Sequence, residues 1–148
     1  MSNVSYKDVR IIMNIVNTDV VIIGAGPVGL FQVFELGLQG LKAVVIDCLP
    51  VIGGQCAELY PDKPIYDIPA LPQANAKDVI DNLWQQAAPF SPVVLLSERV
   101  ERVEKVSDVA FTVSTDKNRI IHCKAVVIAA GNDNDNSANY NPGNCNGV

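Results

Sequence analysis

Near the start of the chain, two buried-strand patterns flank a helix pattern. Residues 18–23 and 42–47 are short apolar runs rich in β-branched side chains, a pattern typical of parallel strands covered on both faces. Between them, residues 27–38 begin with Pro27 and are followed by Gly40, which predicts a helix with proline in its first turn. Together the three segments predict a βαβ unit.

A long irregular stretch and a second helix follow. Residues 48–72 contain several prolines and a pair of adjacent glycines, so we expect a long ordered or functional loop there. Residues 75–88 predict a helix with Asn75 as its cap. The apolar stripe of this helix consists of Val79, Leu83 and Trp84.

Strand patterns dominate the second half of the chain. The expected strands cover residues 93–96, 99–106, 109–113, 120–123 and 125–129. Valines recur at every third position of 99–106, and the flanking strands favour a strand there as well. In the next strand Val109, Phe111 and Val113 alternate with small or polar residues, which predicts half-burial. The last strand is an unbroken apolar run, so we expect it to be fully buried.

This order of elements separates two kinds of nucleotide-binding domain. An ordinary NAD domain repeats β-α alternation in its second half, whereas here a meander reverses at residues 116–118 and a strand then ends at Gly131. That is the order of an FAD-binding domain. The predicted fold class is therefore α/β: a Rossmann-like FAD-binding domain over residues 18–131, with a parallel sheet and an antiparallel β-meander.

The loop after the first strand carries the glycine pattern of a dinucleotide site. Gly24 suits the tight turn from strand to helix, Gly26 leaves room for a pyrophosphate beside the backbone, and Gly29 allows close packing of helix on strand. Pro27 fits the first helical turn, because the N–H that it lacks would have had no helical partner. The remaining amides and the helix dipole can then face the pyrophosphate.

Asp47 ends the second strand, 18 residues after Gly29, in agreement with the position of a ribose-binding acid. Its carboxylate would accept hydrogen bonds from a ribose diol, and its charge disfavours a 2′-phosphate at the same place. The first ligand is therefore expected to be FAD or NAD rather than NADP. The alternative is a glycine-rich loop that only reverses the chain.

Composition and charge argue against several classes of protein. The 148-residue chain is 49% hydrophobic and carries a net charge of -5, which suits one globular domain with its own core. Without a basic block, nucleic acid and anionic membranes are poor partners. The apolar stretch 20–31 is too short to span a bilayer. Residues 1–17, an N-terminal extension, contain no export signal, so a cytoplasmic protein is expected.

The remaining chemically active side chains suggest packing rather than catalysis. The four cysteines form no CxxC pair and no metal-ligand spacing, so we expect reduced thiols and no metal site. Cys48 and Cys56 are interpreted as packing residues, as is Trp84. His122 is expected to be solvated or hydrogen-bonded. Residues 98–105 mix acidic and basic side chains, which predicts a solvated face.

Four blocks of the sequence resemble one family of flavoenzymes. They are Asp19–Leu30 (DVVIIGAGPVGL), Gly53-Gly54-Gln55, Leu59–Asp67 (LYPDKPIYD) and Ala125–Gly131. In unbroken order they are similar to the thioredoxin-reductase-like ferredoxin NADP reductases. The second and third blocks are more specific than the glycine pattern, which the wider flavoprotein class shares.

The resemblance implies a role for each of eight residues in binding FAD. By this resemblance the pyrophosphate loop is Gly24, Gly26, Pro27 and Gly29, the ribose partner is Asp47, and further FAD contacts are Gln55, Tyr60 and Val100. The aromatic ring of Tyr60 would lie near the isoalloxazine, and the backbone of Val100 would meet the adenine. The alternative for Tyr60 is a loop anchor held through its hydroxyl. Val100 is also expected to belong to the core.

The resemblance further implies that NADPH, FAD and ferredoxin exchange electrons in the complete enzyme, which would be a homodimer. Because the flavin supplies the chemistry, no catalytic residue is expected in this segment. The resemblance stops at Gly131. Seven of the 17 residues in 132–148 are asparagine, which predicts a disordered tail.

Three functions therefore compete for the chain. One is the FAD-binding portion of such a reductase, inactive by itself because the NADPH domain would lie outside these residues. The second is a fragment of a thioredoxin-reductase-like pyridine nucleotide-disulfide oxidoreductase. The third is a noncatalytic nucleotide-binding remnant.

Overall fold

A four-stranded parallel sheet lies at the centre of the molecule. The computed structural model describes residues 15–54, 56, 62 and 64–131. The sheet has the order β10-β2-β3-β6, and every neighbouring pair is parallel. Its strands are β2 (Val20–Ile23), β3 (Ala43–Ile46), β6 (Val93–Leu95) and β10 (Ala125–Ile128). All residues of β2 and β3 are buried, which confirms the predicted pair of strands covered on both faces.

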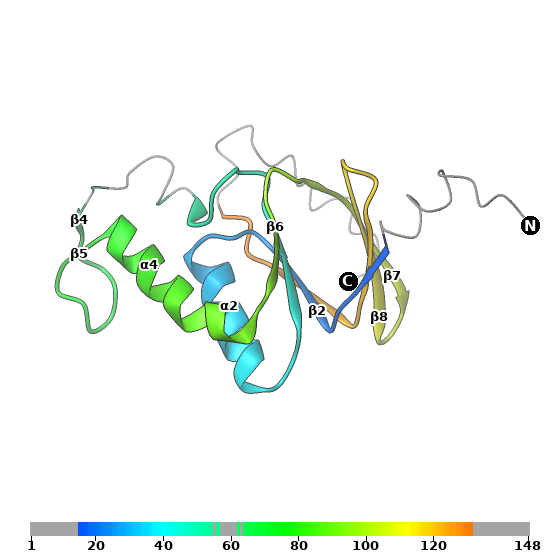
Figure 1. Ribbon diagram of the computed structural model, residues 1–148, viewed down its shortest axis with the longest axis horizontal. Helices are drawn as coiled ribbons and strands as arrows, with labels where there is room; N and C mark the ends of the chain where they lie inside the picture. Colours follow the sequence, from blue (N-terminus) through cyan, green and yellow to red (C-terminus); the bar gives the residue numbers. More distant parts are fainter. Residues whose placement is uncertain (1–14, 55, 57–61, 63, 132–148) are drawn as a thin grey trace, which may run out of the picture.

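Two helices cover one face of this sheet (Figure 1). Helix α2 (Pro27–Leu38) connects β2 to β3 and has the predicted bounds. Helix α4 (Ala76–Ala87) lies beside it and continues into a 3₁₀ turn, η1 (Ala88–Phe90). The core under the helices includes Val20, Ile22, Val33, Val45 and Ala87. Trp84 packs against this core, so its predicted packing role is confirmed.

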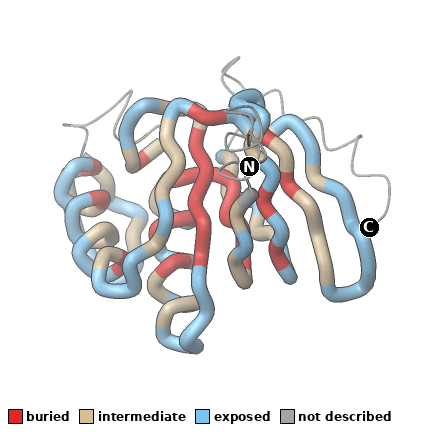
Figure 2. Tube along the Cα trace, turned by 45° about the vertical axis from the view of Figure 1, so that its right-hand side comes forward, coloured by how far each residue is buried: buried red, intermediate tan, exposed pale blue. Residues whose placement is uncertain are grey.

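A second sheet covers the opposite face (Figure 1). Its order is β1-β9-β8-β7, in which β7, β8 and β9 form the predicted antiparallel meander. The strands are β1 (Ile15–Asn17), β7 (Val100–Ser107), β8 (Ala110–Thr115) and β9 (Ile120–Cys123). The core between the sheets includes Val21, Ile23, Val44, Val113 and Ile121. Successive residues of β2 thus point into opposite cores, which places the parallel sheet as the central buried layer seen in Figure 2.

Four details differ from the sequence-based expectations. Strand β1 lies in the segment interpreted as an extension, and it pairs in parallel with β9. The loop after β3 contains β4 (Pro64–Ile65), paired with β5 (Ala74–Asn75). Asn75 is the N-cap residue of α4 but makes no side-chain capping bond. Val109 is 71% exposed and precedes β8.

Strand β10 was expected to be fully buried, and this expectation is wrong. Two of its four residues are exposed and two are half-buried, and the side chain of Ile128 is 52% exposed. The reason is position, because β10 is an edge strand of the parallel sheet and pairs only with β2 among the described strands. An unbroken apolar run identifies a sheet strand, but it does not distinguish a central strand from one at the edge.

Asp19 fixes the corner at which the strands of the two sheets meet. Its carboxylate accepts hydrogen bonds from the Nζ of Lys124 at 2.8 Å and from the N–H of Lys42 at 2.9 Å. Its backbone carbonyl also accepts from the N–H of Lys124. The bonds from Lys124 and from the Lys42 backbone lower the pKa of Asp19 below its ordinary value of 3.8.

Candidate functional site

Two glycines of the predicted fingerprint are required by the packing of the chain itself. Gly24 has a φ of 108°, and a Cβ added to it would collide with the backbone carbonyl of Ala129. A Cβ on Gly29 would collide with the backbone carbonyl of Gly24. Gly24 thus permits the turn between β2 and α2, and Gly29 permits the close approach of helix to strand. Both mechanical roles expected from the sequence are confirmed.

Gly26 differs, because the described protein atoms give no steric reason for its missing side chain. Its φ of -72° suits any residue, and an added Cβ would meet only the Cα of Gly54, at 4.0 Å. That distance is an ordinary van der Waals contact. Among the described residues, nothing fills the space beside Gly26 at the beginning of helix α2. A ligand in close contact with the backbone would explain the glycine.

The beginning of helix α2 is arranged to attract an anion. Gly26 is its N-cap and supplies no side-chain cap, Pro27 occupies the first turn, and this turn contains no acidic residue. The first amides of a helix have no intrahelical acceptor, and the helix dipole is positive at this end. A phosphate group can bind to these amides without competing with a carboxylate of the helix itself.

The adjacent glycines 53 and 54 bring a second loop to the same place. The N–H of Gly53 donates to the carbonyl of Ala25 at 2.8 Å. Gly54 has a φ of 58°, and a Cβ there would lie 3.1 Å from the Cα of Gly26. The two loops therefore meet backbone to backbone. The first two residues of the Gly53-Gly54-Gln55 block are thus part of the site.

Asp47 lies at the end of β3, 9% exposed, and is bonded to the glycine loop. One carboxylate oxygen accepts from the N–H of Ala25 at 2.6 Å, and the other accepts from the N–H of Leu49 at 2.8 Å. These bonds orient the carboxylate and leave acceptor capacity on both oxygens, because each carboxylate oxygen has two lone pairs. A ribose diol could be held there without displacing either backbone bond.

The segment that leads to Val100 runs beside Asp47. The N–H of Asp47 donates to the carbonyl of Leu95 at 2.9 Å, and the N–H of Glu98 donates to the carbonyl of Asp47 at 3.0 Å. Val100 follows two residues later as the first residue of β7. Its side chain is half-buried and packs against the core between the two sheets, so the expected core role is confirmed. Its backbone contact with adenine stays a prediction.

Six of the eight predicted site residues lie in the described part of the chain. The glycine loop and Asp47 are joined by a direct hydrogen bond, and Val100 is connected to them through Glu98. Gln55 and Tyr60 lie outside the described residues, and their proposed contacts with FAD stay predictions. The tail predicted for residues 132–148 lies outside them as well.

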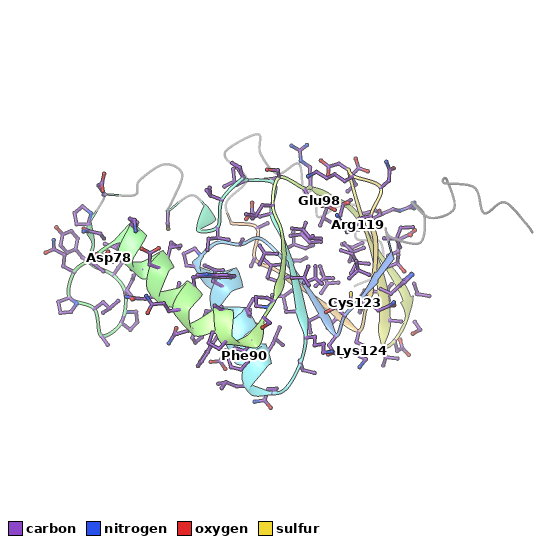
Figure 3. All side chains as sticks on the ribbon, viewed as in Figure 1. Asp78, Phe90, Glu98, Arg119, Cys123 and Lys124 are labelled. Atoms are coloured by element: carbon purple, nitrogen blue, oxygen red, sulfur yellow. The ribbon has the colours of Figure 1, made fainter. Side chains whose placement is uncertain are left out.

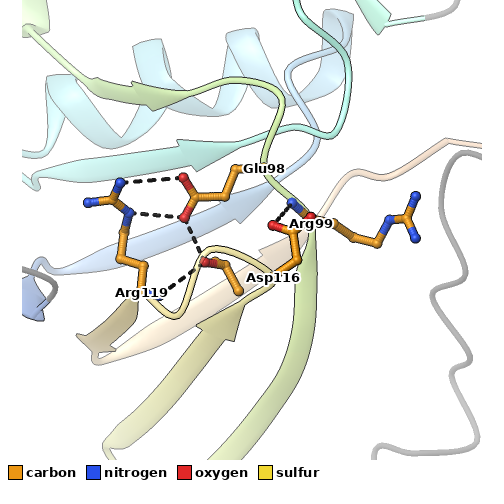
Figure 4. Close-up of polar contacts among 5 residues, drawn as sticks. Glu98, Arg99, Asp116 and Arg119 are labelled. Atoms are coloured by element: carbon orange, nitrogen blue, oxygen red, sulfur yellow. Dashed lines mark hydrogen bonds and ion pairs between the residues drawn. The ribbon is translucent and has the colours of Figure 1, made fainter.

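A group of side chains that the sequence analysis missed connects this site to the meander. Glu98 was assigned to a solvated face, but it is only 2% exposed. Its carboxylate accepts from the hydroxyl of Thr115 at 2.6 Å and from the Nε of Arg119 at 2.9 Å (Figure 4). The assignment was wrong because the turn between β8 and β9 brings Arg119 and Thr115 to Glu98. Other residues of the segment, including Glu101 and Arg102, are exposed as expected.

The cysteines and the histidine in the described residues show no catalytic arrangement. Cys48 and Cys56 are half-buried free thiols, and Cys123 is a buried one. Burial, followed by the negative charge of Asp47, raises the pKa of the Cys48 thiol, and burial raises the pKa of Cys123. Both thiols are therefore held in their protonated, less reactive form. The Nδ1 of His122 lies 3.2 Å from the hydroxyl of Thr112 on the exposed face of the meander, as expected.

The described residues include neither a membrane-spanning helix nor a metal-binding group of side chains. No helix there has the length and apolar content needed to span a bilayer. No group of three or more His, Cys, Asp and Glu side chains in the described ranges is arranged to hold a metal ion.

The chain is similar in sequence to curated bacterial reductases. It is 73% identical over 120 residues to a ferredoxin–NADP reductase from Colwellia psychrerythraea, in an alignment that covers 81% of this chain and 34% of that protein. It is 58% identical over 116 residues to one from a Bradyrhizobium strain, covering 78% and 34%. The chain thus spans about a third of the length of these relatives. No family model matches the sequence.

Solved structures confirm the fold. A thioredoxin reductase from Streptococcus pyogenes superposes with a TM-score of 0.65 at 20% identity, covering 76% of this chain and 34% of that one. An NADP⁺-bound cyclohexanone monooxygenase mutant from Rhodococcus superposes with a TM-score of 0.65 at 23% identity, covering 78% and 26%. The predicted α/β fold with parallel sheet and meander is confirmed as the Rossmann-like fold of these flavoproteins. Over about four fifths of its length, the chain is similar to a stretch of curated ferredoxin–NADP reductases that makes up about a third of their length.

Proposed function

We propose that the chain binds FAD and forms the FAD-binding portion of a ferredoxin–NADP reductase-type flavoprotein oxidoreductase. The observation that carries the proposal is the open space at Gly26. Gly24 and Gly29 are explained by packing, whereas Gly26 faces the uncapped beginning of α2 and the backbone of Gly54. Asp47 is bonded to the same loop. A dinucleotide joins these features, since its pyrophosphate suits the helix end and its ribose suits the carboxylate.

Each predicted site residue has a proposed part in holding the cofactor. The amides after Gly26 would bind the pyrophosphate, Asp47 would bind the adenosine ribose, and the backbone near Val100 would meet the adenine. Gln55 and Tyr60 are proposed to contact FAD, with Tyr60 beside the flavin ring. When bound, FAD would supply the electron-transfer chemistry, so the side chains of this portion are required for binding and orientation and not for acid–base catalysis.

Sequence similarity favours the ferredoxin–NADP reductase type over a disulfide reductase. The identity of 73% to a curated ferredoxin–NADP reductase contrasts with 20% to a thioredoxin reductase structure, which supports only a common fold. In the complete protein, NADPH would be the electron donor and ferredoxin the acceptor, within a cytoplasmic homodimer. Residues 18–131 are the proposed FAD-binding unit.

Titration with two matched nucleotides tests the proposal. ADP carries the adenosine and pyrophosphate that the site is proposed to bind, and 2′-phosphoadenosine 5′-diphosphate differs from it only by a phosphate on the ribose beside Asp47. We expect isothermal titration calorimetry to show at least about tenfold tighter binding of ADP, a difference of about 1.4 kcal/mol. Equal affinity for the two nucleotides, or no binding of ADP, would contradict the proposed site.

A further inference from the structure

Glu98 is the one residue of the described chain that has a buried carboxylate in an ion pair close to the proposed adenosine site. It is 2% exposed, and its partner Arg119 retains a side-chain exposure of 26%. The Nε of Arg119 donates to one carboxylate oxygen at 2.9 Å, and its Nη2 donates to the other at 3.5 Å. A buried carboxylate is costly to desolvate and stays charged only when its partners satisfy it. Its position therefore requires an explanation beyond surface solvation.

The backbone of Glu98 binds one side of the proposed site. Its N–H donates to the carbonyl of Asp47, and the N–H of the preceding Ser97 donates to the carbonyl of Leu49 at 2.9 Å. Ser97 has a φ of 52°, so the chain turns sharply there between β6 and β7. These bonds bring the backbone after β6 alongside the residue proposed to hold the ribose.

The side chain of Glu98 binds the other side, in the turn between β8 and β9. Besides Arg119, it accepts from the hydroxyl of Thr115 at 2.6 Å, and the oxygen of that hydroxyl accepts from the N–H of Arg119 at 3.3 Å. Arg99 and Asp116 are joined by two further hydrogen bonds, each 3.0 Å long. The N–H of Arg99 donates to a carboxylate oxygen of Asp116, and the N–H of Asp116 donates to the backbone carbonyl of Arg99. Figure 3 shows Glu98 and Arg119 near the point where β6 passes into the meander, and Figure 4 shows the polar contacts of the group.

We propose that Glu98 is a positioning residue for the adenosine half of the site, together with Arg119 and Thr115. The backbone of Glu98 is bonded to Asp47, and its carboxylate is bonded to the meander. The backbone of Arg99 and Val100 follows directly in the chain. Glu98 thus fixes the distance between the ribose-binding carboxylate and the strand proposed to meet the adenine. This role rests on the proposed function, because it concerns the same nucleotide.

The test is ADP binding to the full chain carrying Glu98→Gln, which keeps the shape of the side chain and removes its charge. Loss of the charged bonds should displace the Arg99–Val100 backbone and weaken ADP binding by about tenfold, equivalent to the net contribution of about one hydrogen bond. Glu101→Gln is the matched control, since it makes the same change at an exposed position of β7, and it should bind ADP as the wild type does.

A double-mutant cycle separates positioning from general destabilisation. If Glu98 acts through the placement of Asp47 and Val100, its effect on ADP affinity should largely disappear in an Asp47→Asn background. A merely structural role would give additive losses. Thr115→Val removes one bond to Glu98 while keeping a similar shape. It provides a milder variant, expected to lose about threefold, if Glu98→Gln fails to fold.

The possible outcomes are distinct. If the wild type fails to bind ADP, the proposed function is overturned, and the role of Glu98 with it. If the wild type binds ADP and the variants Glu98→Gln and Thr115→Val bind equally well, only the positioning role is overturned. Additive losses in the double-mutant cycle would overturn it as well.

Discussion

Gly26 and Gly29 lie in the same loop and lack a side chain for different physical reasons. At Gly29, a Cβ would overlap the carbonyl of Gly24, so the fold itself requires glycine. At Gly26, a Cβ would make only an ordinary contact with Gly54 among the described residues, so this part of the fold accepts alanine. Glycine at position 29 is therefore required by the fold, whereas glycine at position 26 would be required by a bound ligand.

This difference predicts losses of stability of different size for the same substitution at the two positions. Gly29→Ala should lower the free energy of unfolding by at least about 1 to 3 kcal/mol, because backbone atoms must move to accommodate the methyl group. Gly26→Ala should lower it by less than about 1 kcal/mol, the scale of replacing glycine by alanine at an N-cap. Denaturation in urea measures both values. Equal destabilisation would show that Gly26 is also required for packing.

Asp47 combines two roles that a substitution should reveal. Asp47→Ala removes the carboxylate that is proposed to bind the ribose. The same carboxylate accepts hydrogen bonds from the N–H groups of Ala25 and Leu49. We expect FAD binding to weaken by about 1 to 3 kcal/mol, the cost of leaving buried donors without their charged partner. Flavin fluorescence quenching provides the measurement, with Asp108→Ala at an almost fully exposed carboxylate as control. Unchanged affinity would remove Asp47 from the site.

At the scale of elements, the corner around Asp19 makes stability depend on pH. The bonds from Lys124 and Lys42 lower its pKa in the folded chain below the ordinary value of 3.8. A carboxyl whose pKa is lower in the folded state stabilises that state above the unfolded pKa, and this contribution is lost as the pH falls through the folded pKa.

Asp19→Asn should therefore be less stable than the wild type at neutral pH, and the difference should shrink below a pH of about 4. Thermal unfolding of both proteins across this range provides the measurement. Lys124→Met should reproduce part of this loss of stability, because it removes the side-chain hydrogen bond from Lys124 that lowers the pKa of Asp19. A difference that is the same at pH 7 and at pH 3 would show that the ionised carboxylate is not responsible.

The elements that local sequence defines were predictable, and those defined by distant contacts were not. Helix α2 has the predicted bounds because Pro27 and Gly40 mark its ends in the sequence. Strand β1 has only three residues and depends on pairing with β9, more than a hundred residues away. Local pattern contains no information on such a pairing, and the same holds for the edge position of β10.

The candidate site likewise contains residues that local sequence predicts and one residue that depends on distant contacts. Gly24, Gly26 and Asp47 follow from spacing because the βαβ unit fixes their geometry. Glu98 was missed because its partners are brought to it by the turn before Arg119, and because it lies in the connection between β6 and β7, outside the alternation of either strand. A buried carboxylate is then indistinguishable in sequence from its exposed neighbours.

At the scale of the whole molecule, the chain spans about a third of the length of its curated relatives. Its sequence contains a single glycine fingerprint, which we assign to FAD. Hydride transfer would require a nicotinamide and a flavin ring at about 3 to 3.5 Å from each other, and one such site does not hold both. The purified chain with FAD, NADPH and ferredoxin should therefore show no turnover above the free-flavin background. Turnover above that level would reveal a nicotinamide site in addition to the proposed FAD site, or a partner subunit.

The most direct test of the account is a titration of FAD into the wild-type chain and into Gly26→Ala, with circular dichroism to establish that both are folded. The account predicts saturable binding of one FAD by the wild type. It also predicts a loss of at least about tenfold in affinity for Gly26→Ala at nearly unchanged stability, because the methyl group would occupy the space of the pyrophosphate. Equal FAD affinity of the two folded proteins, or no saturable binding by the wild type, would contradict it.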